Sequence, residues 1–328
     1  MPRRSSPLPP SLGAAFTYRD ALAAGATAGR LRSRDIEHPF HGARLRMRQV
    51  GDEQIDADAY TIDRRARERV QLRARAFAHV MGSQACFTGI TAAALLGAPL
   101  PDGFDPESDL CVATPYPHRA TRARGVRGIQ LRPHLASMEV RDGLRMTSPA
   151  STWALLGGEL SERWLVIVGD YLVRVPRDDR GRRHPELQLT SPVRMDAALR
   201  EPGRRHRSTL ERAAASIRVG SFSRLETEYR LDAAHAGLPE MEIDVEIRDA
   251  GGRLLGIADG VHRSAGVIVE VEGDHHRTSR RQWNRDIDRL AAFAAHGWEV
   301  IRLTGARVRG GTAVPLVAAA LARRARAL

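Results

Sequence analysis

The sequence contains no lysine, and all 51 of its Lys or Arg positions are arginine. A mechanism that needs a catalytic lysine is therefore excluded. Cysteine is scarce as well: the only two are Cys86 and Cys111, and neither lies in a CxxC pattern or at a Cys/His spacing that suits zinc. This favours reduced thiols, and we expect a cytoplasmic protein.

Long apolar runs are also missing. No stretch approaches the ~20 apolar residues that a transmembrane helix needs, so we expect no membrane partner. The first residues, MPRRSSPLPPSLG, are basic but lack the apolar core of a signal peptide. We expect residues 1–15 to form a disordered tail.

Positive charge is what the sequence has in excess. The formal net charge is +12, with 51 basic against 39 acidic residues. A strongly basic chain favours a polyanionic partner, most often nucleic acid, and the planar guanidinium suits phosphate. We therefore expect DNA as a partner, although arginine in place of lysine is also typical of a GC-rich genome.

Residues 16–60 have the pattern of a small DNA-binding module. Apolar residues before a break at Gly25, then Ala28 and Leu31, predict two short helices around a tight turn, as in a helix-turn-helix. A plain helical hairpin has the same pattern. The candidate DNA contacts are Arg30, Arg32 and Arg34.

The central part of the sequence predicts an α/β region over residues 61–175. Helical patterns cover 62–98, short strands punctuated by Pro and Gly cover 109–148, and a helix begins at SPASTWALLGG. Residues 176–207 are rich in Pro, Gly and Arg with little periodicity, which predicts a linker.

Residues 208–328 predict an α/β/α sandwich on a mixed sheet. The segment SFSRLETEYRLDAAHAGLP is typical of a helix that begins with a capping box, in which Ser223 is the N-cap and Glu226 lies three residues on. Three meandering strands follow, EMEIDVEIR, LLGIADGVH and VIVEVEG. An amphipathic helix, the strand WEVIRLT and a basic helix complete the order.

Carboxylates interrupt two of these apolar strands. Asp259 lies within LLGIADGVH, and Glu270 and Glu272 lie two residues apart in VIVEVEG, so their side chains point to one face. The short turn between the strands predicts antiparallel pairing that brings Asp259 near Glu270, and Glu226 could reach the same end. Clustered carboxylates repel one another. We therefore expect a divalent cation, Mg²⁺ or Mn²⁺, among them.

Several of these residues also have a purely structural interpretation. Glu226 could serve only the capping box, and Glu272 could be a solvated charge at a strand end. His275 and His276 follow in a turn, where they are either solvated or placed for proton transfer or phosphate contact. Asp259 and Glu270 fit the structural interpretation poorly, because each interrupts an apolar strand, where a carboxylate is costly.

The segment from 208 to 328 resembles the endonuclease-like domains related to very-short-patch-repair (Vsr) endonucleases, in the PD-(D/E)XK restriction-endonuclease-like superfamily. The motifs that carry the resemblance are SRLETEYRL, AGLP at 236–239, the strand with Asp259, VEVEGDHHR at 269–277, RDIDRL at 285–290 and HGWEVIRLT at 296–304. The resemblance implies a restriction-endonuclease-like fold in which Asp259 and Glu270 hold the metal. The Val271 carbonyl and Glu226 would complete its ligands.

The sequence departs from the family pattern at three places. Glu272 stands where the D…ExK pattern has lysine, Val271 and Glu272 replace Tyr and Asp before the glycine, and a glycine rather than an apolar residue follows Asp259. Without the lysine, the general base must be Glu272, His276 or a second metal.

Residues 1–175 resemble a winged helix-turn-helix of the AbiEi antitoxin type followed by a mixed α/β segment. The resemblance rests on FTYRDALAAGATAGRLRSRDI, HPFHGARLR and DGLRMTSPAST. It implies a small winged-helix-like region over 16–60, and a possible partner protein from a toxin–antitoxin or defence system.

Together these patterns predict a metal-dependent DNA endonuclease. The candidate catalytic residues are Asp259, Glu270, Glu272 and His276; the candidate phosphate contacts are Arg277 and Arg289; His275 and Asp286 are supporting. The alternative is a non-catalytic DNA-binding regulator of the antitoxin type, whose nuclease-like domain is degenerate.

Overall fold

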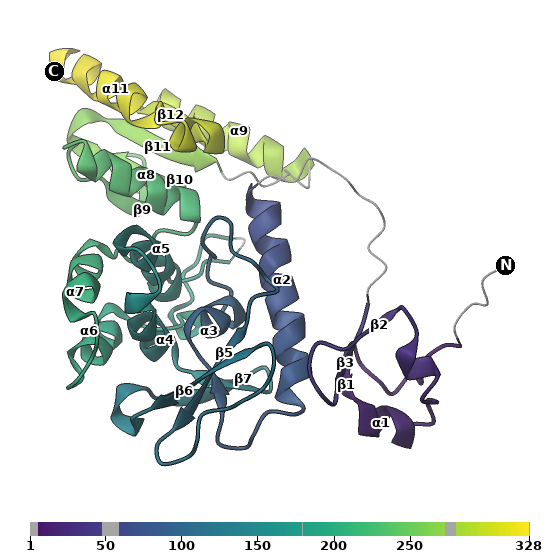
Figure 1. Cartoon of the computed structure of the whole chain (residues 1–328). Coiled ribbons are helices and arrows are strands. Elements are labelled where there is room, and N and C mark those ends of the chain that lie inside the picture. The colour runs from purple at the N-terminus through teal and green to yellow at the C-terminus, as the bar shows by residue number, and fades with distance from the viewer. Residues whose placement is uncertain (1–5, 48–58, 179, 273–279, 328) are drawn as a thin grey trace. The chain divides into compact units, whose positions relative to one another are not determined.

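The structure, a computed structural model, describes residues 6–47, 59–178, 180–272 and 280–327 (Figure 1). In these ranges the chain is a mixed α/β protein, as predicted, and it contains three sheets. No helix within the described ranges is both long and apolar enough to cross a bilayer.

The chain divides into two compact units, which we describe separately. The first comprises residues 1–57, 61–161 and 193–211, and the second comprises residues 58–60, 162–192 and 212–328.

A small three-stranded antiparallel sheet, in the order β1–β3–β2, begins the first unit. Its elements are β1 (Ala15–Thr17), α1 (Tyr18–Ala23), the 3₁₀ turn η1 (Arg30–Arg32), β2 (Ile36–Glu37) and β3 (Ala43–Arg46). The first predicted helix is present as α1, but the second is only the single turn η1. The chain enters β2 at Ile36, which leaves no room for a longer helix.

The rest of the first unit is built on a five-stranded mixed sheet in the order β6–β5–β4–β8–β7. Its strands are β4 (Cys86–Phe87), β5 (Leu110–Pro115), β6 (Val126–Leu131), β7 (Met138–Arg141) and β8 (Leu144–Thr147), and its helices include α2 (Ala59–Ala78), α3 (Gly89–Leu95), α4 (Pro149–Leu155) and α6 (Pro192–Arg200). Ser148 caps α4 by accepting from the Ser151 N–H at 3.4 Å. Trp153 and Phe87 are completely buried in its core.

The second unit contains the four-stranded mixed sheet β12–β11–β10–β9 (Figure 1). Its strands are β9 (Glu242–Arg248), β10 (Leu254–His262), β11 (Val267–Glu272) and β12 (Glu299–Thr304). The pairs β9–β10 and β10–β11 are antiparallel, whereas β11 and β12 are parallel. The parallel pair requires a crossover, and the predicted helix between the two strands provides it.

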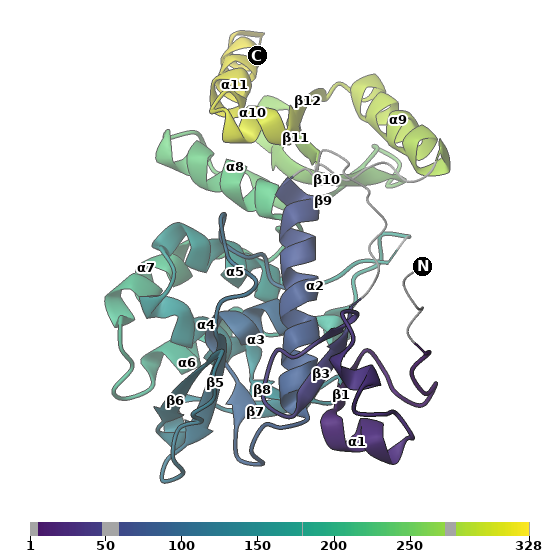
Figure 2. The same ribbon diagram turned by 45° about the vertical axis from the view of Figure 1, so that its right-hand side comes forward.

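Helices cover both faces of this sheet, as can be followed in Figure 2. These helices are α8 (Arg224–His235), α9 (Arg280–Ala295), α10 (Gly305–Arg309) and α11 (Ala313–Ala327). Val269 and Val271 of β11 pack in one apolar cluster with α8 and α11, whereas Ile268 packs in another with Phe293 of α9. Because strand side chains alternate between faces, the predicted α/β/α sandwich is present.

The boundary between the units differs from the one that composition suggests. The helix α5 (Glu162–Val173) belongs to the second unit and contacts α8. The predicted linker at 176–207 is divided: 176–192 joins the second unit, and the rest joins the first. Arg177 and Arg183 hold its first part by ion pairs to the buried Asp244, at 2.7 and 2.8 Å.

Candidate active site

A small cavity lies between α8 and the sheet of the second unit. It offers about 10 Å³ to a water-sized sphere, which is room for about one. The residues that line it are Ser221, Glu226, Arg230, Met241, Ile243, Asp259, Gly260, Val269 and Val271. Two of the predicted metal ligands, Glu226 and Asp259, therefore share one enclosed space with Val271.

Asp259 lies where the ladder between β10 and β11 ends. The last paired residues are Gly260 and Val269. One step beyond them, Asp259 Oδ2 accepts a hydrogen bond from the Val271 N–H at 2.8 Å. The expected antiparallel pairing is present, and it brings Asp259 beside the segment that contains Glu270.

Glu270 is buried on the α9 side of the sheet, and its side chain is only 7% exposed. Its Oε2 lies 2.9 Å from Arg289 Nη2, while its Oε1 is buried with no hydrogen-bond partner among the described residues. Burial and the charge of Asp259 raise the pKa of Glu270 to about 8, and Arg289 opposes this rise. The two carboxylates are thus close enough to repel.

Glu226 forms the predicted capping box and also belongs to the acidic cluster. Ser223 Oγ accepts from the Glu226 N–H at 3.2 Å, and Glu226 Oε2 accepts from the Phe222 N–H at 2.8 Å. Its carboxylate therefore helps to cap α8. Burial, followed by the charges of Asp259 and Glu270, raises its pKa well above the usual value. The capping carboxylate is also a member of the acidic cluster.

The three carboxylates do not form a ready cage for a metal. Among the residues that the structure describes, no three His, Cys, Asp or Glu side chains are arranged so that they could hold an ion. One oxygen of each carboxylate is already engaged, by Val271 N–H, Phe222 N–H or Arg289.

Glu272 lies at the edge of this cluster and has a partner of its own. Its side chain is 30% exposed and forms an ion pair with Arg302 of β12. In the parallel register Arg302 stands beside Glu270, so the guanidinium reaches diagonally to Glu272. This arrangement agrees with a strand-end charge, and a role as general base remains a prediction.

Arg289 is partly buried, with 28% of its side chain exposed, and protein groups hold its guanidinium. Besides Glu270, it donates to the Ile257 carbonyl at 2.6 Å and lies 5.9 Å from the centre of the Phe293 ring. Gly256 leaves space for its stem, because a Cβ there would approach Arg289 Cγ to 2.6 Å. The contacts seen here orient Glu270.

The remaining residues that the sequence predicted for DNA contact, catalysis or support of the site divide into three groups. Arg30 forms a bidentate ion pair with Asp35, at 2.9 and 2.7 Å, so it has a structural role beside the three-stranded sheet. Arg32 and Arg34 are exposed. His275, His276 and Arg277 lie outside the described residues, as does the side chain of Asp286.

The sequence prediction missed Arg230 and Asp170. Arg230 lies one helical turn after Glu226 on α8 and lines the same cavity. Its Nη2 donates at 2.7 Å to Asp170 of α5, which also accepts from Thr227 Oγ1 at 2.9 Å and the Arg218 N–H at 2.8 Å. The Nε of Arg230 is buried without a partner in the described part of the chain.

Two sequence signals could have revealed this pair. Glu226 and Arg230 are four residues apart on one predicted helix, and Asp170 interrupts the apolar run WLVIVGDYLV. Asp170 is 1% exposed, and burial raises its pKa while Arg230 opposes the rise.

The chain matches no family model, no curated protein and no solved structure. Its function is therefore argued from the geometry and charge of the site.

Proposed function

We propose that the second unit hydrolyses phosphodiester bonds in DNA with the help of Mg²⁺ or Mn²⁺. The observation that carries this proposal is the cluster of Glu226, Asp259 and Glu270, in which burial and mutual repulsion raise the pKa of two members. Such a cluster costs folding free energy unless a cation or protons neutralise it. Perturbed carboxylates of this kind are frequent at functional sites.

The oxygen atoms present suit a hard divalent cation. Glu270 Oε1 is buried without a partner in the described residues, and Glu226 and Asp259 line the cavity beside Val271. Asp259, Glu270 and the Val271 carbonyl would hold the ion, with Glu226 as a further ligand. When bound, the ion would acidify a water and stabilise charge on the scissile phosphate.

Arginine takes the place of lysine in this proposal. Arg289 orients Glu270 through their ion pair, and Arg230 brings a guanidinium into the cavity wall while Asp170 holds it. Glu272 or His276 would accept the proton of the attacking water, and Arg277 would contact the phosphate. The excess of positive charge, +12, supports an anionic substrate.

The test is nicking of supercoiled plasmid DNA by the full-length protein with Mg²⁺ or Mn²⁺. Asp259→Asn should lower the rate at least ~100-fold, because the substitution removes a charged ligand. Asp288→Asn is the matched control, since Asp288 is an exposed carboxylate on α9. Equal nicking by wild type and Asp259→Asn would refute the assignment.

One observation favours the second candidate, a non-catalytic DNA-binding regulator that acts with a partner protein of a toxin–antitoxin or defence system. The ion pair between Arg289 and Glu270 already neutralises one carboxylate of the cluster. This function predicts that wild type and Asp259→Asn bind DNA equally tightly and that neither cleaves it at any Mg²⁺ or Mn²⁺ concentration.

A further inference from the structure

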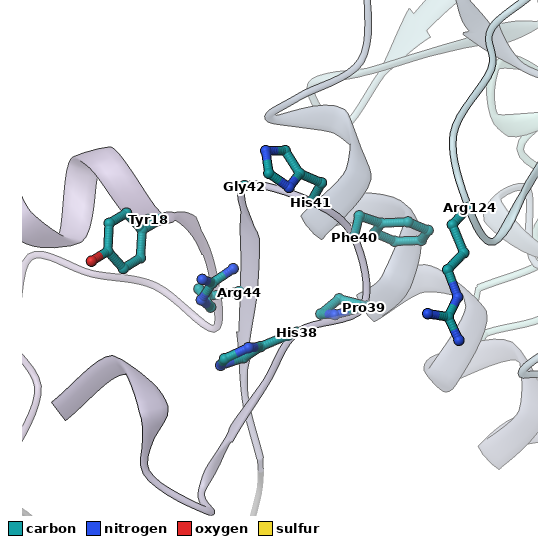
Figure 3. A pocket seen from close by; sticks show the side chains of 8 residues that line it. All are labelled: Tyr18, His38, Pro39, Phe40, His41, Gly42, Arg44 and Arg124. Carbon is teal, nitrogen blue, oxygen red and sulfur yellow. The ribbon is translucent and has the colours of Figure 1, made fainter. Parts of the chain in front are cut away.

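The first unit contains a large open pocket at the turn between β2 and β3, and Arg124, from the segment before β6, completes its wall. Its volume is about 660 Å³, within the range of pockets that hold small molecules. Figure 3 shows the side chains around it, with Arg44 beside Tyr18 and Arg124 on the far side of Phe40. The remaining residues of the wall are His38, Pro39, His41 and Gly42.

The charged side chains that line this pocket are all basic. Two arginines and two histidines contribute to its wall, and none of its eight residues is acidic. Tyr18 adds aromatic surface and Pro39 adds an apolar one, whereas Phe40 is only 4% exposed and supports the wall from behind. Guanidinium groups beside aromatic rings suit a ligand that combines an anion with a planar ring.

Arg44 is fixed in place but keeps a donor free. Its guanidinium lies 5.1 Å from the centre of the Tyr18 ring, and its Nη1 donates to the Ala43 carbonyl at 2.8 Å. Tyr18 is held in turn, because its N–H donates to the Gly42 carbonyl at 2.8 Å. The Nε of Arg44 is buried and has no partner in the described residues.

Leaving that N–H unpaired is costly, because a buried donor without an acceptor loses its hydration. Burial also lowers the pKa of Arg44, and the nearby Tyr18 opposes this change. An anion that accepts a hydrogen bond from Arg44 would reduce both the cost of the unpaired N–H and the cost of burying the guanidinium charge.

The opposite wall is equally well supported. Phe40 is buried and packs edge-on against Phe77, with ring centres 4.9 Å apart. Gly125 lies against Phe40, since a Cβ there would come within 3.3 Å of the ring, and this contact places the neighbouring Arg124 at the pocket. Arg124 is exposed and has no ion pair within the described ranges. On the Arg44 side of the pocket, His38 Nε2 donates to the Leu31 carbonyl at 2.9 Å (Figure 3).

We propose that this pocket binds one nucleotide unit. Its phosphate would accept from Arg44, its base would lie against Tyr18 and Pro39, and Arg124 would add positive charge from the opposite wall. The unit belongs either to a free mononucleotide or to a single-stranded DNA chain. No residue of the candidate active site takes part, so the inference goes beyond the proposed nuclease function.

The test measures binding to the full-length protein in EDTA, where metal-dependent cleavage cannot contribute. The probe is a fluorescein-labelled 12-mer of thymidylate, followed by anisotropy, with dAMP and inorganic phosphate as competitors. Arg44→Gln should raise Kd about 10-fold or more, because it removes a charge-assisted hydrogen bond, and Arg124→Gln should raise Kd several-fold, because it removes positive charge from the pocket wall. Arg44→Lys keeps the charge but lacks the Nε donor, so it should fall between wild type and Arg44→Gln.

Two control variants remove the same charge just outside the pocket. Arg46→Gln lies two residues from Arg44 on β3, and Arg122→Gln lies two residues from Arg124; both side chains are exposed. They should raise Kd less than about 2-fold. Circular dichroism of each variant checks that the fold is unchanged.

The competitors identify the source of the nucleotide. Displacement by dAMP supports a free mononucleotide, whereas weak displacement together with tight, Arg44-dependent oligonucleotide binding supports a single strand. The proposal is overturned if Arg44→Gln and Arg124→Gln bind like Arg46→Gln and Arg122→Gln. It is also overturned if inorganic phosphate competes as well as dAMP, or if a duplex 12-mer binds more tightly through the same arginines.

Discussion

Replacing Glu270 with glutamine should stabilise the metal-free protein at neutral and alkaline pH. In the fold, burial and the charge of Asp259 raise the pKa of Glu270 from its ordinary 4.5 to about 8, despite the ion pair with Arg289. The folded state therefore holds this proton more tightly than the unfolded state does. This contribution to stability is complete below pH 4.5 and is lost as the pH rises toward 8.

The magnitude follows from the size of the shift. At ~1.4 kcal/mol for each pKa unit, ionised Glu270 costs roughly 4–5 kcal/mol of folding free energy at pH 8. Glutamine has the shape of the protonated acid and does not ionise. It leaves Arg289 without its ion partner, but that side chain is 28% exposed, so the loss is at most ~1 kcal/mol. We expect a net gain of ~3 kcal/mol or more.

Urea unfolding in EDTA at pH 5, 6, 7 and 8 measures this effect. Wild type should lose stability steadily across the range, and Glu270→Gln should lose much less. Some slope should remain, because burial also raises the pKa of Glu226. Glu272→Gln is the matched control: it lies on the same strand, but its partner is Arg302, and it should keep the wild-type slope. If Glu270→Gln is no more stable than wild type at pH 8, the acidic cluster does not exist as described.

Two further substitutions test the packing of each unit. Asp170→Asn should lower the free energy of unfolding by about 3 kcal/mol, because it leaves the nearly buried Arg230 without its counter-ion. The double variant Asp170→Asn/Arg230→Met should recover part of this loss. Urea unfolding of the single and double variants measures both effects. Trp153→Ala should lower the free energy of unfolding by ~3–5 kcal/mol, because loss of the completely buried indole leaves a cavity. Val140 is exposed, so Val140→Ala is the control and should change the midpoint of urea unfolding little.

The C-terminal sheet could be predicted because its signals are local. Alternating residues predicted β9, and short turns before β10 and β11 fixed antiparallel pairing. Antiparallel pairing then brought Asp259 beside Glu270 without any knowledge of distant contacts. The helix-capping signal at Ser223 was equally local and is present in α8.

What could not be predicted depends on contacts between distant segments. Arg289 reaches Glu270 from a helix that packs across the sheet, and Asp170 reaches Arg230 across 60 residues of sequence. The periodicity of a sequence shows on which face of a helix or strand a side chain lies, but it does not show which two faces pack together. The predicted linker failed for the same reason, since its arginines are held by Asp244, 61 or more residues away.

The positive charge that balances the acidic cluster comes from arginine, because the chain has no lysine. Glu226, Asp259 and Glu270 bring three negative charges when ionised, and Arg289 neutralises one of them. Arg230 adds no net positive charge, because Asp170 already balances it. Two negative charges remain, the amount that one divalent cation balances. Burial, followed by repulsion from the neighbouring carboxylates, raises the pKa values of Glu226 and Glu270, so protons can balance the remaining charge when no cation is bound.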